Sequence, residues 1–303
     1  MAIAPPTPEL LDALVQACQQ SGLDASGAEL IHHYTNAVFL LPAEQAVARI
    51  TTGGRRRSAA IAHRVTDWLA TEHGLPTTQP LPTAPAVGVA DSLITFWTYY
   101  PQPEIAVEPT SADLARLLRR LHDLPTQPMQ LPDWQPLASL ESTVSGYDNP
   151  AILATGDRDW LLTEVATTKA ALAHLDWPLG MGLIHGDAWL GNLLWERCRD
   201  GWRPILGDWD GVAFGPREID LIPTWHAATR YGRGPEWTAA FVDIYGHDLA
   251  TWDGYGVLAH MRDLVQLTGP LRRARLGTVF EQVLRQRLTG IRDHDDRPWI
   301  ALR

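Results

Sequence analysis

The sequence predicts an α+β protein with a small N-terminal lobe built on an antiparallel sheet and a larger, mostly helical C-terminal lobe. In the first hundred residues, short runs of strand-forming residues alternate with turn residues, whereas apolar residues recur at helical spacing beyond residue 110. In the middle of the chain, two further apolar runs each end at a carboxylate. We place the lobe boundary near residue 101, which divides residues 1–100 from residues 101–303.

The elements of the N-terminal lobe follow from its patterning. Residues 7–22 place leucines at helical spacing and close with Gly22, so they predict an amphipathic helix. Three strand-like runs at 28–31, 36–41 and 45–50 are separated by turn residues and predict an antiparallel meander. A second helix is expected over 58–73, and an apolar strand over 93–100 runs into Pro101, where it can form the hinge between the lobes.

Beyond the hinge, helical patterns predominate. The sequence predicts helices over 111–123 and 157–174, and then over 219–229, 234–246, 252–270 and 272–288. Residues 125–150 are rich in Pro, Ser and Asp, and we interpret them as an irregular segment, either a loop facing the substrate or a surface insertion.

Composition narrows the class of protein. The 303 residues are 45% hydrophobic and 20% charged, no window approaches eighteen uninterrupted apolar residues, and the N-terminus lacks a signal-peptide pattern. We therefore expect a soluble, cytoplasmic protein without a membrane partner; its oligomeric state stays open. A net charge of -10 argues against a nucleic-acid partner, because affinity for phosphate backbones comes from Lys and Arg. A neutral or cationic small molecule fits better.

The central stretch carries the chemistry. One apolar run ends in His185-Gly186-Asp187, followed five residues later by Asn192, and the next run ends in Asp208-Trp209-Asp210. Asp187 can accept the proton of a hydroxyl, while Asn192 and Asp208 offer oxygen ligands to Mg²⁺. His185 can orient the turn through bonds to nearby backbone, and Asp210 either supports the metal ligands or forms the turn. Phosphoryl transfer to a hydroxyl needs this arrangement.

His185-Gly186-Asp187 with Asn192 resembles the HGDxxxxN signature of the aminoglycoside phosphotransferase and choline kinase family, and Asp208-Trp209-Asp210 resembles its metal-binding segment. The resemblance implies a bilobal protein-kinase-like fold with ATP or GTP in the cleft. By matching positions, Asp187 is the catalytic base, and Asn192 and Asp208 hold Mg²⁺. The resemblance also implies a nucleotide hinge made by Thr98, Tyr99 and Tyr100, and we expect Asp220 on the following helix to anchor the motif loop.

The sequence departs from the family pattern in the phosphate-binding part. Arg49 stands where the family has a lysine; it keeps the charge and can bind two phosphate oxygens. The helix glutamate that pairs with that cation is absent, because Ala62 occupies its place, so Asp67 or another group must orient Arg49, or the pair is dispensed with. The turn containing Thr35 is either a phosphate cradle or an ordinary hairpin turn. The basic run at 55–57 is either solvated or contacts a polyphosphate.

The expected activity is ATP- or GTP-dependent, Mg²⁺-dependent phosphorylation of a small-molecule hydroxyl. The acceptor is an aminoglycoside or other antibiotic, or an amino sugar; the alternatives are a choline or amino-alcohol kinase of metabolism and a catalytically silent kinase-like nucleotide-binding protein. The catalytic lobe has a modest acidic excess, which suits a cationic acceptor but also serves solubility. We select as substrate contacts the carboxylates Glu218, Asp243 and Asp263 and the aromatic residues Trp225 and Tyr231.

Overall fold

The computed structural model describes residues 5–33, 36–104, 107–125 and 129–302. By its contacts the chain forms two compact units. The first joins Met1–Pro132 with His185–Ala213, and the second joins Asp133–Ile184 with Phe214–Arg303. The central motif thus belongs to the same compact unit as the N-terminal sheet. The functional lobe boundary near residue 101 stays a prediction.

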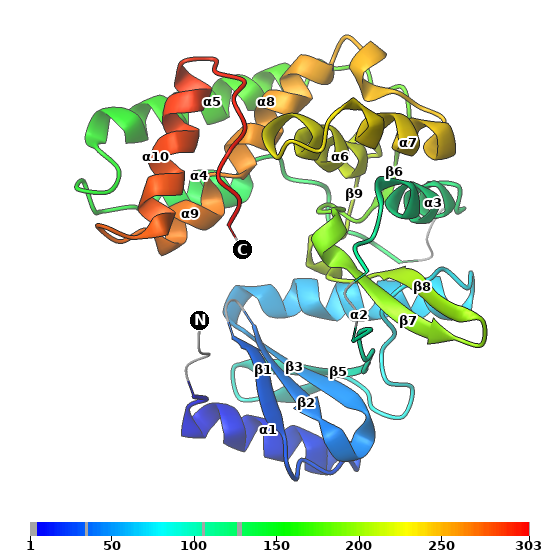
Figure 1. Cartoon of the computed structure of the whole chain (residues 1–303). Coiled ribbons are helices and arrows are strands. Elements are labelled where there is room, and N and C mark those ends of the chain that lie inside the picture. Colours follow the sequence, from blue (N-terminus) through cyan, green and yellow to red (C-terminus); the bar gives the residue numbers. More distant parts are fainter. Residues whose placement is uncertain (1–4, 34–35, 105–106, 126–128, 303) are drawn as a thin grey trace. The chain divides into compact units, whose positions relative to one another are not determined.

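The first unit is built on an antiparallel sheet with the strand order β1-β2-β3-β5-β4 (Figure 1). Its strands are β1 (Glu29–His33), β2 (Ala37–Leu41), β3 (Ala46–Thr52), β4 (Val87–Val89) and β5 (Ser92–Thr98). The predicted meander is therefore confirmed. Strand β4 was not predicted, because it has only three residues and is too short to show a period.

Helix α1 (Pro8–Ser21) covers one face of this sheet and helix α2 (Arg56–Thr71) lies on the other (Figure 1). Side chains alternate between the two faces of a strand, so Ala48 and Ile50 of β3 enter the core under α1 together with Phe96 of β5. Arg49, between them, projects toward the opposite face. This alternation decides which β3 side chains face α2.

Two further elements complete the first unit, namely helix α3 (Ser111–His122) and the hairpin of β7 (Leu193–Cys198) and β8 (Gly201–Leu206). The hairpin pairs Leu193 with Leu206 at its open end and Cys198 with Gly201 at its turn. The paired open end brings the residues before Leu193 close to those after Leu206, and these are the two halves of the central motif.

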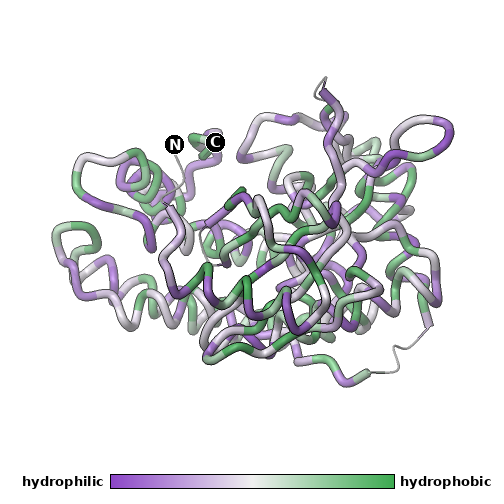
Figure 2. Tube along the Cα trace, turned by 90° about the horizontal axis from the view of Figure 1, so that it is seen from below, coloured by the Kyte–Doolittle hydropathy of each residue, from purple (hydrophilic) through white to green (hydrophobic). Residues whose placement is uncertain are grey.

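The second unit is mainly helical. Along the chain as a whole, short hydrophobic and hydrophilic stretches alternate (Figure 2). It contains α4 (Ala138–Ser145), α5 (Thr155–Leu172), α6 (Glu218–Arg230), α7 (Pro235–Tyr245), α8 (Tyr255–Val265), α9 (Thr268–Arg273) and α10 (Val279–Arg292), with β6 (Met181–Ile184) paired to β9 (Ala213–Pro216). Within the described ranges, no helix has both the length and the apolar character needed to cross a bilayer.

The structure corrects two of the expected elements. Residues 125–150 are not irregular throughout, because Leu140 and Val144, one helical turn apart, are buried and anchor α4. The helix expected over 252–270 is two helices. Helix α8 ends at Val265, and α9 then places Pro270 in its first turn, where its missing N–H leaves no intrahelical bond unmade.

Candidate active site

The two halves of the central motif are held against each other by two glycines. Gly186 has a φ of +82°, and a Cβ there would overlap the Gly211 carbonyl oxygen and lie 2.9 Å from its carbonyl carbon. A Cβ on Gly211 would in turn lie 3.1 Å from the carbonyl oxygen of His185. Only glycine permits this approach of two backbones. The turn that carries Asp187 therefore sits directly on the turn that follows Asp208.

His185 ties both turns together through backbone bonds. Its ring is fully buried, Nε2 lies 2.8 Å from the carbonyl oxygen of Gly207, and Nδ1 lies 3.3 Å from the backbone nitrogen of Asp187. The backbone N–H of Asp187 can only donate, so Nδ1 accepts and the ring proton is on Nε2, where it is donated to Gly207. The ring also packs on buried Trp209, with 4.6 Å between centroids. His185 thus orients the turn and is shielded from substrate.

Asn192 closes the first turn. Its side-chain nitrogen donates to the carbonyl oxygen of Asp187 at 2.8 Å, and its own carbonyl oxygen accepts the N–H of Gly207 at 2.8 Å. Because the amide nitrogen is engaged with Asp187, the amide oxygen is the atom left to meet a cation. The turn that carries Asp187 and the turn that begins at Asp208, which we call the metal-ligand turn after its predicted role, consequently share one backbone network.

The second turn begins with strained backbone. Asp208 adopts a left-handed conformation, with φ 56° and ψ 60°, which is uncommon outside glycine and typical of functional turns. Desolvation in the turn raises the pKa of Asp208 and the negative charge of Asp210 raises it further, while Arg49 opposes both. Two carboxylates set this close repel each other unless a cation lies between them.

The donor set fits a hard divalent cation. Asp208 is exposed over 56% of its side chain, Asn192 offers an amide oxygen, and Oδ1 of Asp210 is buried without a hydrogen-bond partner. Among the described residues no cluster of three or more His, Cys, Asp or Glu side chains could by itself hold a metal. Mg²⁺ accepts one or two protein carboxylates when phosphate and water supply its other ligands, so these residues suit Mg²⁺ bound together with a nucleotide.

Arg49 is held by the metal-ligand turn. Its Nη2 forms an ion pair with Oδ2 of Asp210 and lies 3.8 Å from Oδ1 of Asp208. Asn36 donates to the same Oδ2 at 3.3 Å. At the helix position where a glutamate was expected, Ala62 is buried with 1% exposure. The carboxylate that meets Arg49 in this chain is therefore that of Asp210.

The predicted nucleotide hinge has two of its backbone donors already engaged. The N–H of Thr98 donates to Gln79 O at 2.9 Å, and that of Tyr99 donates to Gln45 O at 3.1 Å. An adenine edge would have to meet other groups of this segment. Burial, together with nearby Glu196, raises the pKa of Tyr100 to about 12, so its hydroxyl is neutral. Thr35, the other predicted nucleotide contact, lies outside the described residues.

Gln102 fixes the predicted hinge segment to the hairpin of β7 and β8. Its amide nitrogen donates to the carbonyl oxygens of Tyr100 at 2.8 Å and of Trp195 at 3.2 Å, and its oxygen accepts the N–H of Trp195 at 3.0 Å. The Gln102 amide thus bonds both the N–H and the C=O of Trp195, as the backbone of a neighbouring strand would. The predicted hinge segment is thereby positioned by β7.

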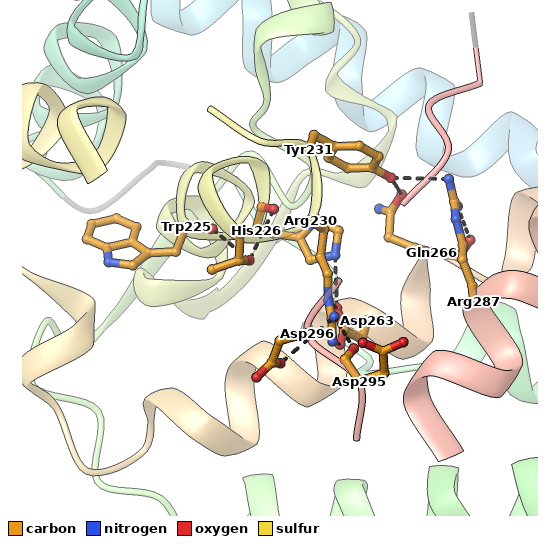
Figure 3. Close-up of polar contacts among 10 residues, drawn as sticks. Trp225, His226, Arg230, Tyr231, Asp263, Gln266, Arg287, Asp295 and Asp296 are labelled. Carbon is orange, nitrogen blue, oxygen red and sulfur yellow. Dashed lines mark hydrogen bonds and ion pairs between the residues drawn. The ribbon is translucent and has the colours of Figure 1, made fainter. Parts of the chain in front are cut away.

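Asp263, selected from the sequence as a substrate contact, belongs to an internal network of the helical unit (Figure 3). It is only 8% exposed and accepts hydrogen bonds from Arg230, with Nη2 at 2.5 Å, and from His226 at 3.0 Å. Burial alone would raise the pKa of Asp263, but these two donors hold it below its usual value. This carboxylate neutralises a buried arginine, which argues against a substrate role.

The other substrate candidates differ in exposure. Glu218 is fully buried and accepts the N–H of Leu179 at 2.6 Å, and Trp225 is buried against Phe241. Tyr231 is partly buried, and its hydroxyl bonds Gln266 and accepts from Arg287 (Figure 3). Asp243 on α7 is exposed. Burial of Glu218 and Trp225 argues against direct contact with a substrate, whereas the exposure of Asp243 and of part of Tyr231 is compatible with it; all four stay substrate predictions. Asp220 is fully buried in the first turn of α6, and its anchoring of the motif loop stays a prediction.

Comparison with known proteins identifies the family. The sequence profile of the phosphotransferase enzyme family, APH, matches residues 27–259. The chain belongs to this phosphotransferase family. Its fold is that of the small-molecule kinases, as the sequence predicted. No curated protein sequence shows significant similarity to the chain.

Solved structures agree with the family fold. The amicoumacin kinase hAmiN, in complex with AMP-PNP, Ca²⁺ and Ami, aligns with a TM-score of 0.71 at 13% identity, over 97% of this chain and 98% of that one. Aminoglycoside phosphotransferase APH(3'')-Id from Streptomyces rimosus aligns with a TM-score of 0.61 at 21% identity, over 84% and 98%. Choline kinase LicA from Streptococcus pneumoniae aligns with a TM-score of 0.64 at 13% identity, over 93% and 99%. At these identities the likeness is one of fold.

Proposed function

We propose that this phosphotransferase transfers the terminal phosphoryl group of ATP or GTP to a hydroxyl of a small molecule. The observation that carries the proposal is the pair of interlocked turns, which brings Asp187, Asn192, Asp208 and Arg49 into one compact unit. A base, two oxygen ligands and a cation for phosphate are the parts that phosphoryl transfer requires.

In this proposal Asp187 accepts the proton of the acceptor hydroxyl or orients that hydroxyl as the new bond forms. His185 and Asn192 hold the backbone of Asp187 from two sides, so its carboxylate starts from a fixed turn. Asn192 and Asp208 would hold Mg²⁺, which neutralises charge on the nucleotide phosphates when bound. Arg49 would bind phosphate oxygens through its planar guanidinium.

The structural relatives suggest the chemical class of the acceptor. The proteins aligned above are named as kinases or phosphotransferases of amicoumacin, aminoglycosides and choline. Aminoglycosides and choline both carry hydroxyl groups and positive charge. We propose a cationic, hydroxylated acceptor, an aminoglycoside, other antibiotic or amino sugar ahead of choline or another amino alcohol. Asp243, the exposed carboxylate among the candidates, is the residue that we would test first.

A catalytically silent kinase-like protein is the second candidate, because the expected helix glutamate is missing at Ala62. The pairing of Arg49 with Asp210 weakens that argument, since the cation has a carboxylate partner after all. The full set of Asp187, Asn192 and Asp208 also favours turnover.

The test begins with thermal unfolding in the presence of ATP or GTP, with and without Mg²⁺. Release of ADP or GDP is then measured over a panel of aminoglycosides, amino sugars, choline and amino alcohols, and the phosphorylated product is detected by mass spectrometry. The Asp187→Ala variant is the control for contaminating kinases. Mg²⁺-dependent nucleotide binding without a phosphorylated product on any panel member would favour the silent alternative.

A further inference from the structure

We propose that Asp210, held in place by Asn36, orients the guanidinium of Arg49 toward the nucleotide phosphates. This inference rests on the proposed function. It assigns the two acids of the metal-ligand turn different tasks, with Asp208 facing the metal and Asp210 positioning the phosphate-binding cation. Asn36 and Asp210 are then positioning residues, which act on the nucleotide through Arg49.

Arg49 is mostly buried and needs a neutralising partner. Its side chain is only 15% exposed, and a buried guanidinium is strongly unfavourable unless a carboxylate neutralises it. Asp210 supplies that carboxylate directly through the ion pair with Nη2. A flexible arginine held in this way has fewer conformations to lose when it binds phosphate, so part of the ordering cost is met before the ligand arrives.

The two acids of the metal-ligand turn differ in exposure and in their contact with Arg49. Asp208 has 56% of its side chain exposed and lies 3.8 Å from Arg49, whereas Asp210 has 34% exposed and contacts it directly. The more exposed acid is the one that can turn to an arriving metal ion. The less exposed acid is already committed to Arg49 through Oδ2.

Asn36 holds the carboxylate of Asp210 through a hydrogen bond. It is 6% exposed and lies immediately before β2, and its amide donates to the same Oδ2 that meets Arg49. Strands β2 and β3 pair Val38 with Arg49, so Asn36 and Arg49 are fixed relative to each other by the sheet. A neutral donor on the shared oxygen fixes the carboxylate without competing for the charge of Arg49.

Helix α2 packs against the 3₁₀ turn η4 (Trp209–Gly211), which contains Asp210. The α2 position at which a glutamate was expected carries buried Ala62, and the neighbouring His63 packs edge-on against Trp97 at 5.3 Å. Neither side chain can supply a negative charge to Arg49. The turn itself therefore supplies the carboxylate that the helix lacks.

The experiment is a double-mutant cycle on nucleotide affinity, measured by calorimetry with the 303-residue chain, Mg²⁺ and a non-hydrolysable ATP analogue. Arg49→Ala, Asp210→Ala and the double variant form the cycle, and Asp210→Asn removes the charge while keeping the shape. We expect each single variant to weaken nucleotide binding roughly tenfold, about 1.4 kcal/mol, and the double variant to be little worse than either single one. Asn36→Ala should weaken binding in the same direction by a smaller factor.

The matched control is the exposed ion pair of Lys169 and Glu141 in the helical unit, 2.9 Å apart, at positions to which no nucleotide contact is assigned. Its two alanine variants should leave nucleotide affinity unchanged. Thermal unfolding identifies any variant that has lost its fold, and for those Asp210→Asn takes the place of Asp210→Ala. With an acceptor in hand, Asp210→Asn should raise the KM for nucleotide and leave the KM for acceptor unchanged, a split that a general loss of stability would not produce.

The outcomes separate this inference from the proposed function. Additive effects of Arg49→Ala and Asp210→Ala, or unchanged nucleotide affinity in Asp210→Asn, would overturn the inference even in an active enzyme. Coupled effects on binding in a protein that phosphorylates nothing on the panel would support the inference and count against turnover. A wild-type chain that binds no nucleotide would overturn both.

Discussion

Replacing Gly186 by alanine tests whether the interlocked turns create the active site. The added Cβ would overlap the Gly211 carbonyl oxygen and lie 2.9 Å from the carbonyl carbon, whereas carbon atoms normally approach to about 3.5–4.0 Å. Both partners are backbone, so no side chain can swing aside. The turns must separate by roughly 1 Å, and a displacement of that size in a catalytic group can cost about 10²-fold in rate.

The matched control is Gly27→Ala. Gly27 also has a positive φ, +71°, but an added Cβ there would meet nothing within 4 Å. Both variants incur the left-handed backbone penalty of about 1–2 kcal/mol, and only Gly186→Ala adds the overlap. We expect Gly186→Ala to lose about 10²-fold or more in phosphoryl transfer and Gly27→Ala to retain near wild-type activity, measured as product formation on the same acceptor. Equal activity of the two folded variants would refute the reasoning.

Other outcomes follow from individual residues. Asp187→Ala should lower transfer by about 10²–10⁴-fold with Mg²⁺-nucleotide binding retained, whereas Asp208→Ala should weaken both, as calorimetry and product assays can separate. Asp263→Ala leaves buried Arg230 without its carboxylate and should destabilise the fold by about 3–5 kcal/mol in chemical denaturation; unchanged stability would restore Asp263 as a substrate candidate. Burial lowers the pKa of His226, so the unfolded chain binds more protons just below about pH 6.5 and stability should fall as pH drops through that window. Thermal unfolding from about pH 7.5 to about pH 5.5 should show this loss in the wild type and a smaller loss in His226→Gln.

Much of the fold could be predicted from the sequence, because its long elements bury one face with a regular period. The strands around Arg49 and the helices ending at Gly22 and near Leu172 appear where the patterns indicated. Short elements could not be predicted in this way. Helix α4 has two buried anchors, Leu140 and Val144, and two anchors one turn apart do not establish a period.

The candidate site, too, could be predicted only where its residues are close together in the sequence. The spacing from Asp187 to Asn192 and the position of Asp208 are local, so the motif could be recognised from the residues. The partner of Arg49 could not, since Asp210 lies 161 residues away and Asn36 lies 174 residues from Asp210. For Asp263 in the helical unit, the sequence pattern and the structure point to different roles. The charge of Asp263 suggested substrate binding, but its burial beside Arg230 depends on packing that no local pattern reveals.

The arrangement around Asp210 also implies a link between metal and phosphate binding. A helix glutamate would hold a phosphate-binding cation independently of the metal ligands, whereas here the partner of Arg49 lies two residues after Asp208 in one short turn. A cation bound at Asp208 screens the repulsion between the two acids, so Asp210 can keep its contact with Arg49. Mg²⁺ should therefore strengthen phosphate binding through Arg49 as well as through its own contacts. If the two contacts were independent, Mg²⁺ would raise nucleotide affinity by the same factor in Arg49→Ala as in the wild type. We expect a smaller factor in Arg49→Ala, measured by calorimetry with and without Mg²⁺.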